Sequence, residues 1–265
     1  MQHDNGLGWT FDTAAEEYDK YRPGYPEELY KTVFSYIPVS NGSRALEIGI
    51  GTGQATTPFL KAGCNVTAVE YGETLAQRCR EKFAEYPGFS VVTGKFEDVS
   101  LPEGEYDLVY SATAFHWIPE DIGYPKVLSL LRPGGAFTRF AVRPCVAEDN
   151  KQLAGEIEAL YARYYYPYYD RKPMKPEPFT EKQAGELAAI AGRYGFTDLR
   201  HELFRRVRSF NAKEYRALLM TYSDHIAMEE SVREPFLDGI ERAIEESGGI
   251  ININDTIDLE LARKP

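Results

Sequence analysis

The sequence predicts an α/β protein built on a doubly wound, mostly parallel β-sheet. Short apolar runs alternate with segments of helical spacing between residues 43 and 142, which is the pattern of a parallel sheet covered by helices on both faces. A glycine-rich turn joins the first run to the helix after it, as expected where such a sheet binds a ligand. Two further strand-like segments lie near the end of the chain. Because crossovers between parallel strands are right-handed, the first set winds into one sheet.

The elements follow in order from a proline-rich segment, YRPGYP, at residues 21–26. A helix is expected directly after it over 26–37, and Asn41-Gly42 marks the turn that ends this unit. The predicted strands and the helices between them are listed here: strands at 43–49, 65–70, 89–94, 106–112 and 136–142, and helices at 54–63, 72–86 and 121–135, the last stopping at a Gly-Gly pair.

The pattern changes after residue 146. A helical stretch is interrupted by the Tyr-rich and Pro-rich segment 161–179, and we interpret 146–196 as an inserted helical cap. Residues 197–210 read as an edge strand, helices fill 212–247, and a last strand follows at 251–264. These two late strands predict an antiparallel edge hairpin. The chain thus divides into a core with an N-terminal cap segment (1–145), the inserted cap (146–196) and a C-terminal part that completes the sheet (197–265).

Composition limits the partners of the protein. The 265 residues contain 30 Lys and Arg against 41 Asp and Glu, and the net charge of -11 disfavours nucleic acid and anionic lipid. Membrane-length apolar stretches and a secretion signal are missing from the sequence, so we expect a cytoplasmic protein. The three cysteines suggest neither disulfides nor zinc, and His3 and His201 have no partners at metal-ligand spacing, so we expect no metal.

The glycine-rich turn, ALEIGIGTGQ, carries the strongest functional signal. Gly49, Gly51 and Gly53 allow a sharp turn and close approach of a ligand, and the helix beyond offers free N–H groups. Glu70 ends the next strand, where an acidic side chain can accept both hydroxyls of a ribose. Together these residues predict a nucleoside site. Gln54 stands where a dinucleotide fingerprint has its last glycine, which disfavours a nicotinamide-dependent oxidoreductase.

At Glu47, Gly49, Gly51 and Gly53 the chain resembles the class I S-adenosylmethionine-dependent methyltransferases. The segment FDTAAEEYDKYRPGYP, residues 11–26, is similar to the cap of their small-molecule, trans-aconitate methyltransferase-like subgroup. The resemblance implies a Rossmann-like sheet of seven strands with an antiparallel last strand, and S-adenosyl-L-methionine as cofactor.

The resemblance also implies roles for particular residues. The glycine loop would lie against the methionine part of the cofactor and Glu70 would hold the ribose. The segment from Ser111 to Trp117 would pass beneath the methionine part and line the acceptor pocket. The remaining candidates are Phe96 and Glu97 for the adenine, and Tyr18, Tyr21 and Arg22 for the cofactor's carboxylate.

Methyl transfer requires mainly alignment of donor and nucleophile and exclusion of water, and a base helps only when the nucleophile arrives protonated. His116 is the candidate base, with a packing role as the alternative. Trp117 is a pocket wall or a core residue. Tyr165, in the Tyr-rich segment, either closes over an organic acceptor, packs the cap onto the core or forms a dimer contact. Tyr222 either faces the pocket or lies on a helix surface.

The sequence thus predicts a methyltransferase acting on a small-molecule acceptor, at oxygen in preference to nitrogen. The alternative is a catalytically silent module that binds S-adenosylmethionine as a sensor or partner subunit, which would bind the cofactor without turnover. The sequence predicts neither the acceptor nor the oligomeric state.

Overall fold

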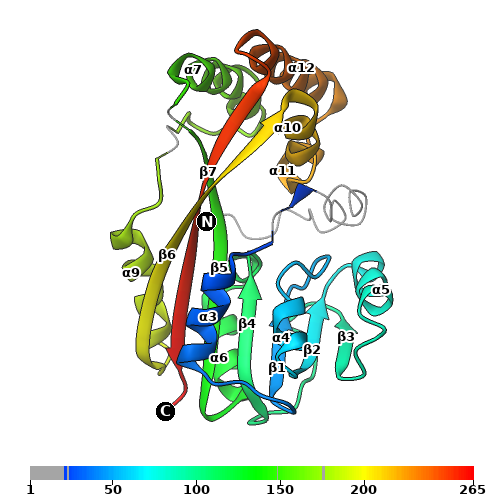
Figure 1. Cartoon of the computed structure of the whole chain (residues 1–265), viewed down its shortest axis with the longest axis vertical. Helices are drawn as coiled ribbons and strands as arrows, with labels where there is room; N and C mark the ends of the chain where they lie inside the picture. Colours follow the sequence, from blue (N-terminus) through cyan, green and yellow to red (C-terminus); the bar gives the residue numbers. More distant parts are fainter. Residues whose placement is uncertain (1–20, 23, 148, 175–176) are drawn as a thin grey trace.

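A single seven-stranded sheet runs through the protein. The computed structural model describes residues 21–22, 24–147, 149–174 and 177–265. The strand order is β3-β2-β1-β4-β5-β7-β6, and β7 runs antiparallel to both of its neighbours while the other pairs are parallel. This confirms the predicted doubly wound sheet with an antiparallel last strand (Figure 1). The strands are β1 Arg44–Ile48, β2 Asn65–Glu70, β3 Phe89–Thr93, β4 Tyr106–Ala112, β5 Leu131–Val146, β6 Thr197–Asn211 and β7 Ile250–Arg263.

Helices cover both faces of the sheet because the buried strands present apolar side chains on either side. One face packs against α3 (Glu27–Tyr36), α4 (Thr57–Lys61) and α5 (Glu73–Lys82), whose apolar residues join one core cluster. The other face packs against α6 (Glu120–Leu130) and α9 (Glu181–Gly192), which join a second cluster. The three cysteines are free, in agreement with the sequence. Within the described ranges, no helix is long and apolar enough to cross a membrane.

The helix predicted over 121–135 was too long. It ends at Leu130, and the next five residues begin β5. Arg132 precedes Pro133, and the residue before a proline is disfavoured in the α conformation. Leu131 instead pairs with Tyr106, and the register shifts before the regular pairing with β4 resumes. The predicted Gly-Gly helix stop is therefore a bend within the start of a strand.

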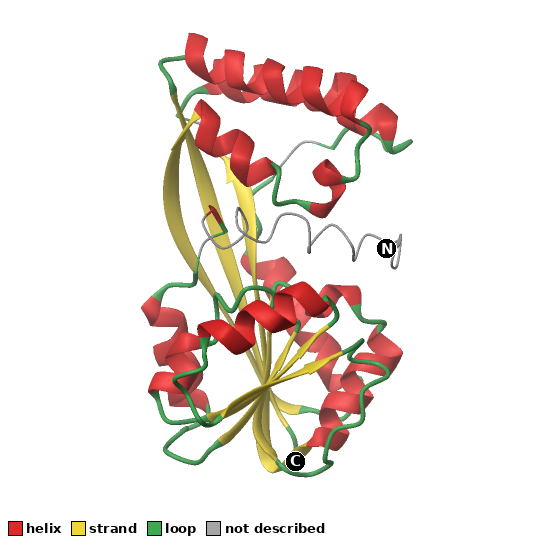
Figure 2. Cartoon of the chain, turned by 90° about the vertical axis from the view of Figure 1, so that its right-hand side faces the viewer, coloured by secondary structure: helices red, strands yellow, loops and turns green. Residues whose placement is uncertain are grey.

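Three long strands carry a second layer of helices beyond the core. β5, β6 and β7 extend past the other strands, and α7 (Lys151–Leu160), η2 (Tyr161–Tyr165), α8 (Tyr166–Tyr168), α10 (Ala212–Leu219), α11 (Ser223–Ile226) and α12 (Glu230–Glu246) lie at their far end (Figures 1 and 2). We call this set the distal helical layer. The predicted cap, 146–196, supplies α7, η2 and α8 to it, whereas α9 packs on β6 and β7. A third apolar cluster joins the layer to Ile251 and Ile253 of β7.

Ion pairs between the strands hold this extension together. The Asp255 side chain is 0% exposed and accepts from Arg206 Nε at 2.9 Å and from Arg208 Nε at 2.6 Å. On neighbouring strands, Arg139 pairs with Glu260 at 2.5 Å. A buried carboxylate is tolerated only when such partners replace its hydration. The strands that carry the distal layer are thus held together in part by buried ion pairs, and loss of either partner would leave a buried charge without its counter-ion.

Asp255→Ala should destabilise the fold by about 3–5 kcal/mol, because it leaves two guanidinium groups without their carboxylate. Urea unfolding measures this cost. Glu73→Ala is the matched control, since Glu73 is 72% exposed and its pair with Arg80 is a surface ion pair worth under ~1 kcal/mol. Equal costs for the two variants would contradict a structural role for Asp255.

Candidate active site

A tight glycine turn follows β1 at the carboxyl edge of the sheet. Gly49, Gly51 and Gly53 have φ values of 71°, 59° and 80°, in the left-handed region that side chains with a Cβ disfavour. An added Cβ would lie 2.5 Å from Ala114 Cβ at Gly49, and 2.5 Å from the Phe83 ring at Gly53. Two of these positions therefore require glycine for space as well as conformation. The turns extend to Thr56, so α4 begins three residues later than predicted.

Glu70 is fixed beside this loop. Its Oε2 accepts from the Gly51 N–H at 2.8 Å and its Oε1 accepts from the Gly72 N–H at 2.9 Å. The side chain ends β2 and is mostly buried, at 7% exposure. A carboxylate oxygen has a second lone pair for a further donor. The structure thus brings Glu70 and the glycine loop together, as their spacing predicted.

Glu47 lies beneath the same loop and has no solvent exposure. Its Oε2 accepts from Thr56 Oγ1 at 2.7 Å and from the Tyr110 hydroxyl at 2.8 Å, whereas its Oε1 is buried without a hydrogen-bond partner. Burial raises the pKa of Glu47 to about 7; the two hydroxyl donors oppose this shift and the Glu70 carboxylate adds to it. The sequence matched Glu47 to a motif but gave no signal for this environment, because Tyr110 comes from β4 and Thr56 from the far end of the folded turn.

The adenine candidates lie in the connection after β3. Phe96 is 4% exposed and packs in the core cluster on the α6 side of the sheet, with the Lys126 Nζ 5.0 Å from its ring centre. Lys126 also donates to the backbone oxygen of Glu97 at 3.1 Å, and the Glu97 side chain is half-buried. Phe96 is thus a core residue at this edge, and contact of either residue with adenine stays a prediction.

The end of β4 supplies the next candidates. Ser111 is buried and its hydroxyl donates to the Ile48 carbonyl at 2.9 Å, so it ties β4 to β1. Thr113 has a φ of 56° and its hydroxyl lies 2.7 Å from that of Tyr25. Trp117 is 39% exposed, so it is not a core residue.

His116 is exposed to solvent, and neighbouring protein atoms cover only part of its ring. Its ring centre lies 5.0 Å from that of Trp117. This desolvation, followed by the charges of Arg143 and Arg139, lowers the pKa of His116 to about 4. The imidazole is therefore neutral at physiological pH and can accept a hydrogen bond or a proton.

Arg22 and Tyr21 lie against the distal layer. Arg22 donates from Nε to Thr221 Oγ1 at 3.0 Å and from Nη2 to the Thr221 carbonyl at 3.1 Å, and its guanidinium lies 4.2 Å from the centre of the Tyr222 ring. Tyr21 packs against the apolar cluster of the same layer. The structure thus joins the candidates Arg22 and Tyr222, which are far apart in sequence. Tyr18 lies outside the described residues.

The Tyr-rich segment packs within the distal layer. Tyr165 donates to the Asp224 carboxylate and Tyr169 to the Asp224 carbonyl, while the Tyr161 hydroxyl lies 3.0 Å from His225 Nε2. These hydroxyls therefore fasten η2 and α8 to α11. Tyr165 is 7% exposed, and its contact with an acceptor stays a prediction.

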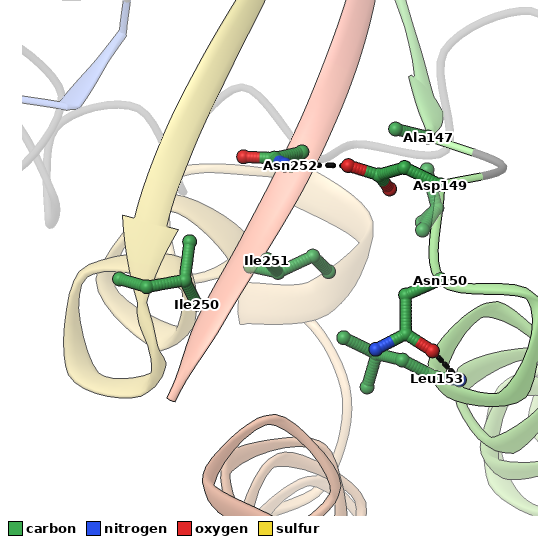
Figure 3. A pocket seen from close by; sticks show the side chains of 8 residues that line it. Ala147, Asp149, Asn150, Leu153, Ile250, Ile251 and Asn252 are labelled. Carbon is green, nitrogen blue, oxygen red and sulfur yellow. Dashed lines mark hydrogen bonds between the residues drawn. The ribbon is translucent and has the colours of Figure 1, made fainter. Parts of the chain in front are cut away.

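A small cavity of about 190 Å³ lies between the start of α7 and the start of β7 (Figure 3). The polar side chains that line this cavity form hydrogen bonds within the protein. Asn252 donates to Asp149 at 2.6 Å, and Asn150 caps α7 by accepting from the Leu153 N–H at 3.0 Å. It is formed by residues remote from the glycine loop. In the described part of the chain, no group of three His, Cys, Asp or Glu side chains is placed to hold a metal.

The sheet order and the glycine turn define a Rossmann-like methyltransferase fold. A family described as "Methyltransferase domain" matches residues 45–135. An uncharacterized methyltransferase of Geobacillus sp. strain WCH70 is 32% identical over 189 residues, covering 64% of this chain and 88% of that protein. The chain therefore belongs to the class I S-adenosylmethionine-dependent methyltransferases, whose cofactor is S-adenosyl-L-methionine.

Solved structures share the fold at low sequence identity. A protein of Anaeromyxobacter dehalogenans assigned as a type II methyltransferase matches with a TM-score of 0.64 and 20% identity, covering 92% of this chain and 98% of that one. Phosphoethanolamine N-methyltransferase 2 of Haemonchus contortus, solved with phosphomonomethylethanolamine and S-adenosylhomocysteine, matches with a TM-score of 0.56 and 15% identity. The match covers 96% of this chain, which spans 57% of the length of that enzyme.

The residues at the loop fit such a cofactor. The glycines leave the backbone open to close approach, and Glu70 presents a carboxylate acceptor beside Gly51. A Cβ at either Gly49 or Gly53 would fill space that the loop needs.

Gly53→Ala should lower the free energy of unfolding at least twice as much as Gly104→Ala does. It should also weaken S-adenosylmethionine binding more than tenfold. Both glycines have positive φ, at 80° and 69°, but only Gly53 has neighbours within 4 Å. The strain of the left-handed conformation alone is worth about 1 kcal/mol. Thermal unfolding and calorimetric titration measure the two effects, and unchanged affinity in Gly53→Ala would contradict the placement of the cofactor.

Proposed function

We propose that this methyltransferase transfers a methyl group to oxygen, in preference to nitrogen, of a small organic molecule. The observation that carries this proposal is the link from Arg22 to Thr221 and Tyr222, together with that from Tyr25 to Thr113. Arg22 thus contacts the distal layer while Tyr25 contacts the residue that follows β4, at the edge where open α/β sheets bind ligands, and this supports an acceptor site between the two. An acceptor enclosed there would be small, and the net charge of -11 further disfavours nucleic acid.

The cofactor, when bound, supplies an electrophilic methyl group on a sulfonium sulfur. The chain's contribution is to hold the donor, align the acceptor and exclude water. Glu70 would accept the ribose hydroxyls. The other proposed cofactor residues are Tyr21, Arg22, Gly49, Gly51, Gly53, Phe96, Glu97 and Ser111, and we propose Trp117, Tyr165 and Tyr222 on the acceptor side.

His116 is the proposed catalytic residue. Its neutral imidazole can accept the proton of an acceptor hydroxyl, whereas a carboxylate acceptor arrives ionised and needs no base. The N-terminal similarity at 11–26 supports the trans-aconitate methyltransferase-like subgroup, so small carboxylic acids come first in a screen of acceptors, followed by phenols and amines. Turnover of S-adenosylmethionine with any of these classes tests the proposal, and binding without turnover would favour the sensor module.

Glu70→Gln should weaken S-adenosylmethionine binding about tenfold or more, because the ribose hydroxyls lose a charged acceptor worth about 1.5–3 kcal/mol. Calorimetric titration provides the affinity. Glu73→Gln, three residues on and exposed, serves as the matched control and should bind like the wild type. An unchanged affinity in Glu70→Gln would remove this residue from the site.

With an acceptor that arrives protonated, such as a phenol, His116→Ala should reduce kcat at least tenfold at pH 7 with little change in cofactor affinity, whereas turnover of a carboxylate should not depend on this residue. In the wild type, a group with a pKa of about 4 is protonated only below that pH, so activity that depends on neutral His116 should fall as the pH drops through about 4 and not near 6.5. The pH profile of kcat checks both expectations. Wild-type turnover in His116→Ala would leave this residue a structural role.

A further inference from the structure

Glu47 is a buried carboxyl group with no positively charged partner among the residues that the structure describes. Its exposure is 0%, and one of its oxygens, Oε1, has neither solvent nor a donor. The buried acids of β7 are matched to arginines, as Asp255 is, and the buried Glu70 accepts two backbone N–H groups. An unmatched buried carboxylate is costly, so the protonated form is favoured until a positive charge arrives.

The groups around Glu47 do not supply that charge. Tyr110 faces it from β4, Tyr30 from α3 and Glu70 from β2, and the only titratable charge among these is the second carboxylate. Lys82 reaches the same loop from α5, where it donates to the Thr52 carbonyl at 2.8 Å. In the absence of a ligand, burial and Glu70 hold the pKa of Glu47 near neutrality, at about 7.

The glycine loop lies between the two carboxyl groups. Glu47 precedes Gly49 by two residues, and its donor Thr56 closes the other end of the loop. Glu70, which ends β2, accepts from the Gly51 N–H at 2.8 Å. Because the Glu47 carboxyl group is fully buried, a charge bound on this loop is weakly screened from it, so no direct contact is needed.

We propose that Glu47 ionises when a cationic ligand occupies the glycine loop, and that this makes the site select for the ligand's positive charge. The inference rests on the proposed cofactor site. S-adenosylmethionine carries a carboxylate, an ammonium and a sulfonium, whereas S-adenosylhomocysteine lacks the sulfonium and has no net charge. The Glu47 carboxyl gives its proton to the buffer, and the carboxylate that remains balances the sulfonium. The demethylated product then loses this attraction.

The test is calorimetric titration of the wild type and Glu47→Gln with both nucleosides at pH 6, 7 and 8. Each titration is run in phosphate and in Tris, whose ionisation enthalpies differ, to count the protons released. At pH 7 the wild type should release roughly half a proton more than Glu47→Gln on binding S-adenosylmethionine. The ligand's own ammonium titrates equally with both proteins, so the difference between them belongs to Glu47.

The affinity for S-adenosylmethionine should rise from pH 6 to pH 8 by up to about tenfold more in the wild type than in Glu47→Gln. The rise for S-adenosylhomocysteine should be smaller. Glu103→Gln removes an exposed carboxylate before β4 and should match the wild type. Tyr110→Phe removes one donor to Glu47 and should move the pH midpoint of binding upward, which keeps the test decisive if Glu47→Gln does not fold.

Equal proton release by the wild type and Glu47→Gln, with both nucleosides bound, would overturn this inference alone. An unmoved midpoint in Tyr110→Phe would also overturn it. Failure of the wild type to bind either nucleoside would overturn the proposed cofactor site as well.

Discussion

The tight left-handed turn between β1 and α4 is the constraint on which the candidate site depends. Gly49 and Gly53 leave no room for a Cβ against Ala114 and the Phe83 ring. A side chain at either position would therefore have to displace Ala114 or the buried Phe83 ring. The same turn directs the Gly51 N–H at Glu70 and brings Thr56 onto Glu47. Conformation, packing and electrostatics of the site thus follow from one short stretch of backbone.

The long strands impose a second constraint, because they set the distance between the core edge and the distal helical layer. β7 pairs along its length with both β5 and β6, and its buried Asp255 fixes two arginines of β6. One of them, Arg206, also donates to the Gly24 carbonyl at 2.7 Å. The segment that contacts the distal layer through Arg22 is therefore held at its other end by the sheet.

Local patterns in the sequence were sufficient for the core. Apolar runs located the five parallel strands, and a charged, alternating segment located β6. The spacing from the glycines to Glu70 placed both at one edge of the sheet, because parallel strands end at the same edge. The sequence failed where distant segments decide the outcome. The β5 strand is longer at both ends than predicted, since its start pairs with Tyr106 and its end with Ile253.

Partners of individual site residues were also beyond local patterns. The sequence around Arg22 does not predict its contacts with Thr221 and Tyr222, which lie nearly two hundred residues away. The burial of Glu47 and the burial of Phe96 likewise depend on helices and strands that pack only in the folded chain. Motif spacing identifies which residues reach the sheet edge, whereas their ionisation and hydrogen bonds are tertiary properties.

Charge is distributed unevenly along the site, and this orders the proposed chemistry. Two carboxyl groups, Glu47 and Glu70, flank the glycine loop. Beyond the end of β4, desolvation and then the charges of Arg143 and Arg139 on β5 lower the pKa of His116, although both arginines have acidic partners. In a methyl transfer from a sulfonium to an anionic oxygen, positive charge disappears from the donor while negative charge disappears from the acceptor. A negative field at the donor end and a positive field at the acceptor end stabilise these reactants before transfer and release both neutral products after it. This difference in charge between the two ends of the site would therefore govern the binding of substrates and the release of products, in addition to the chemical step.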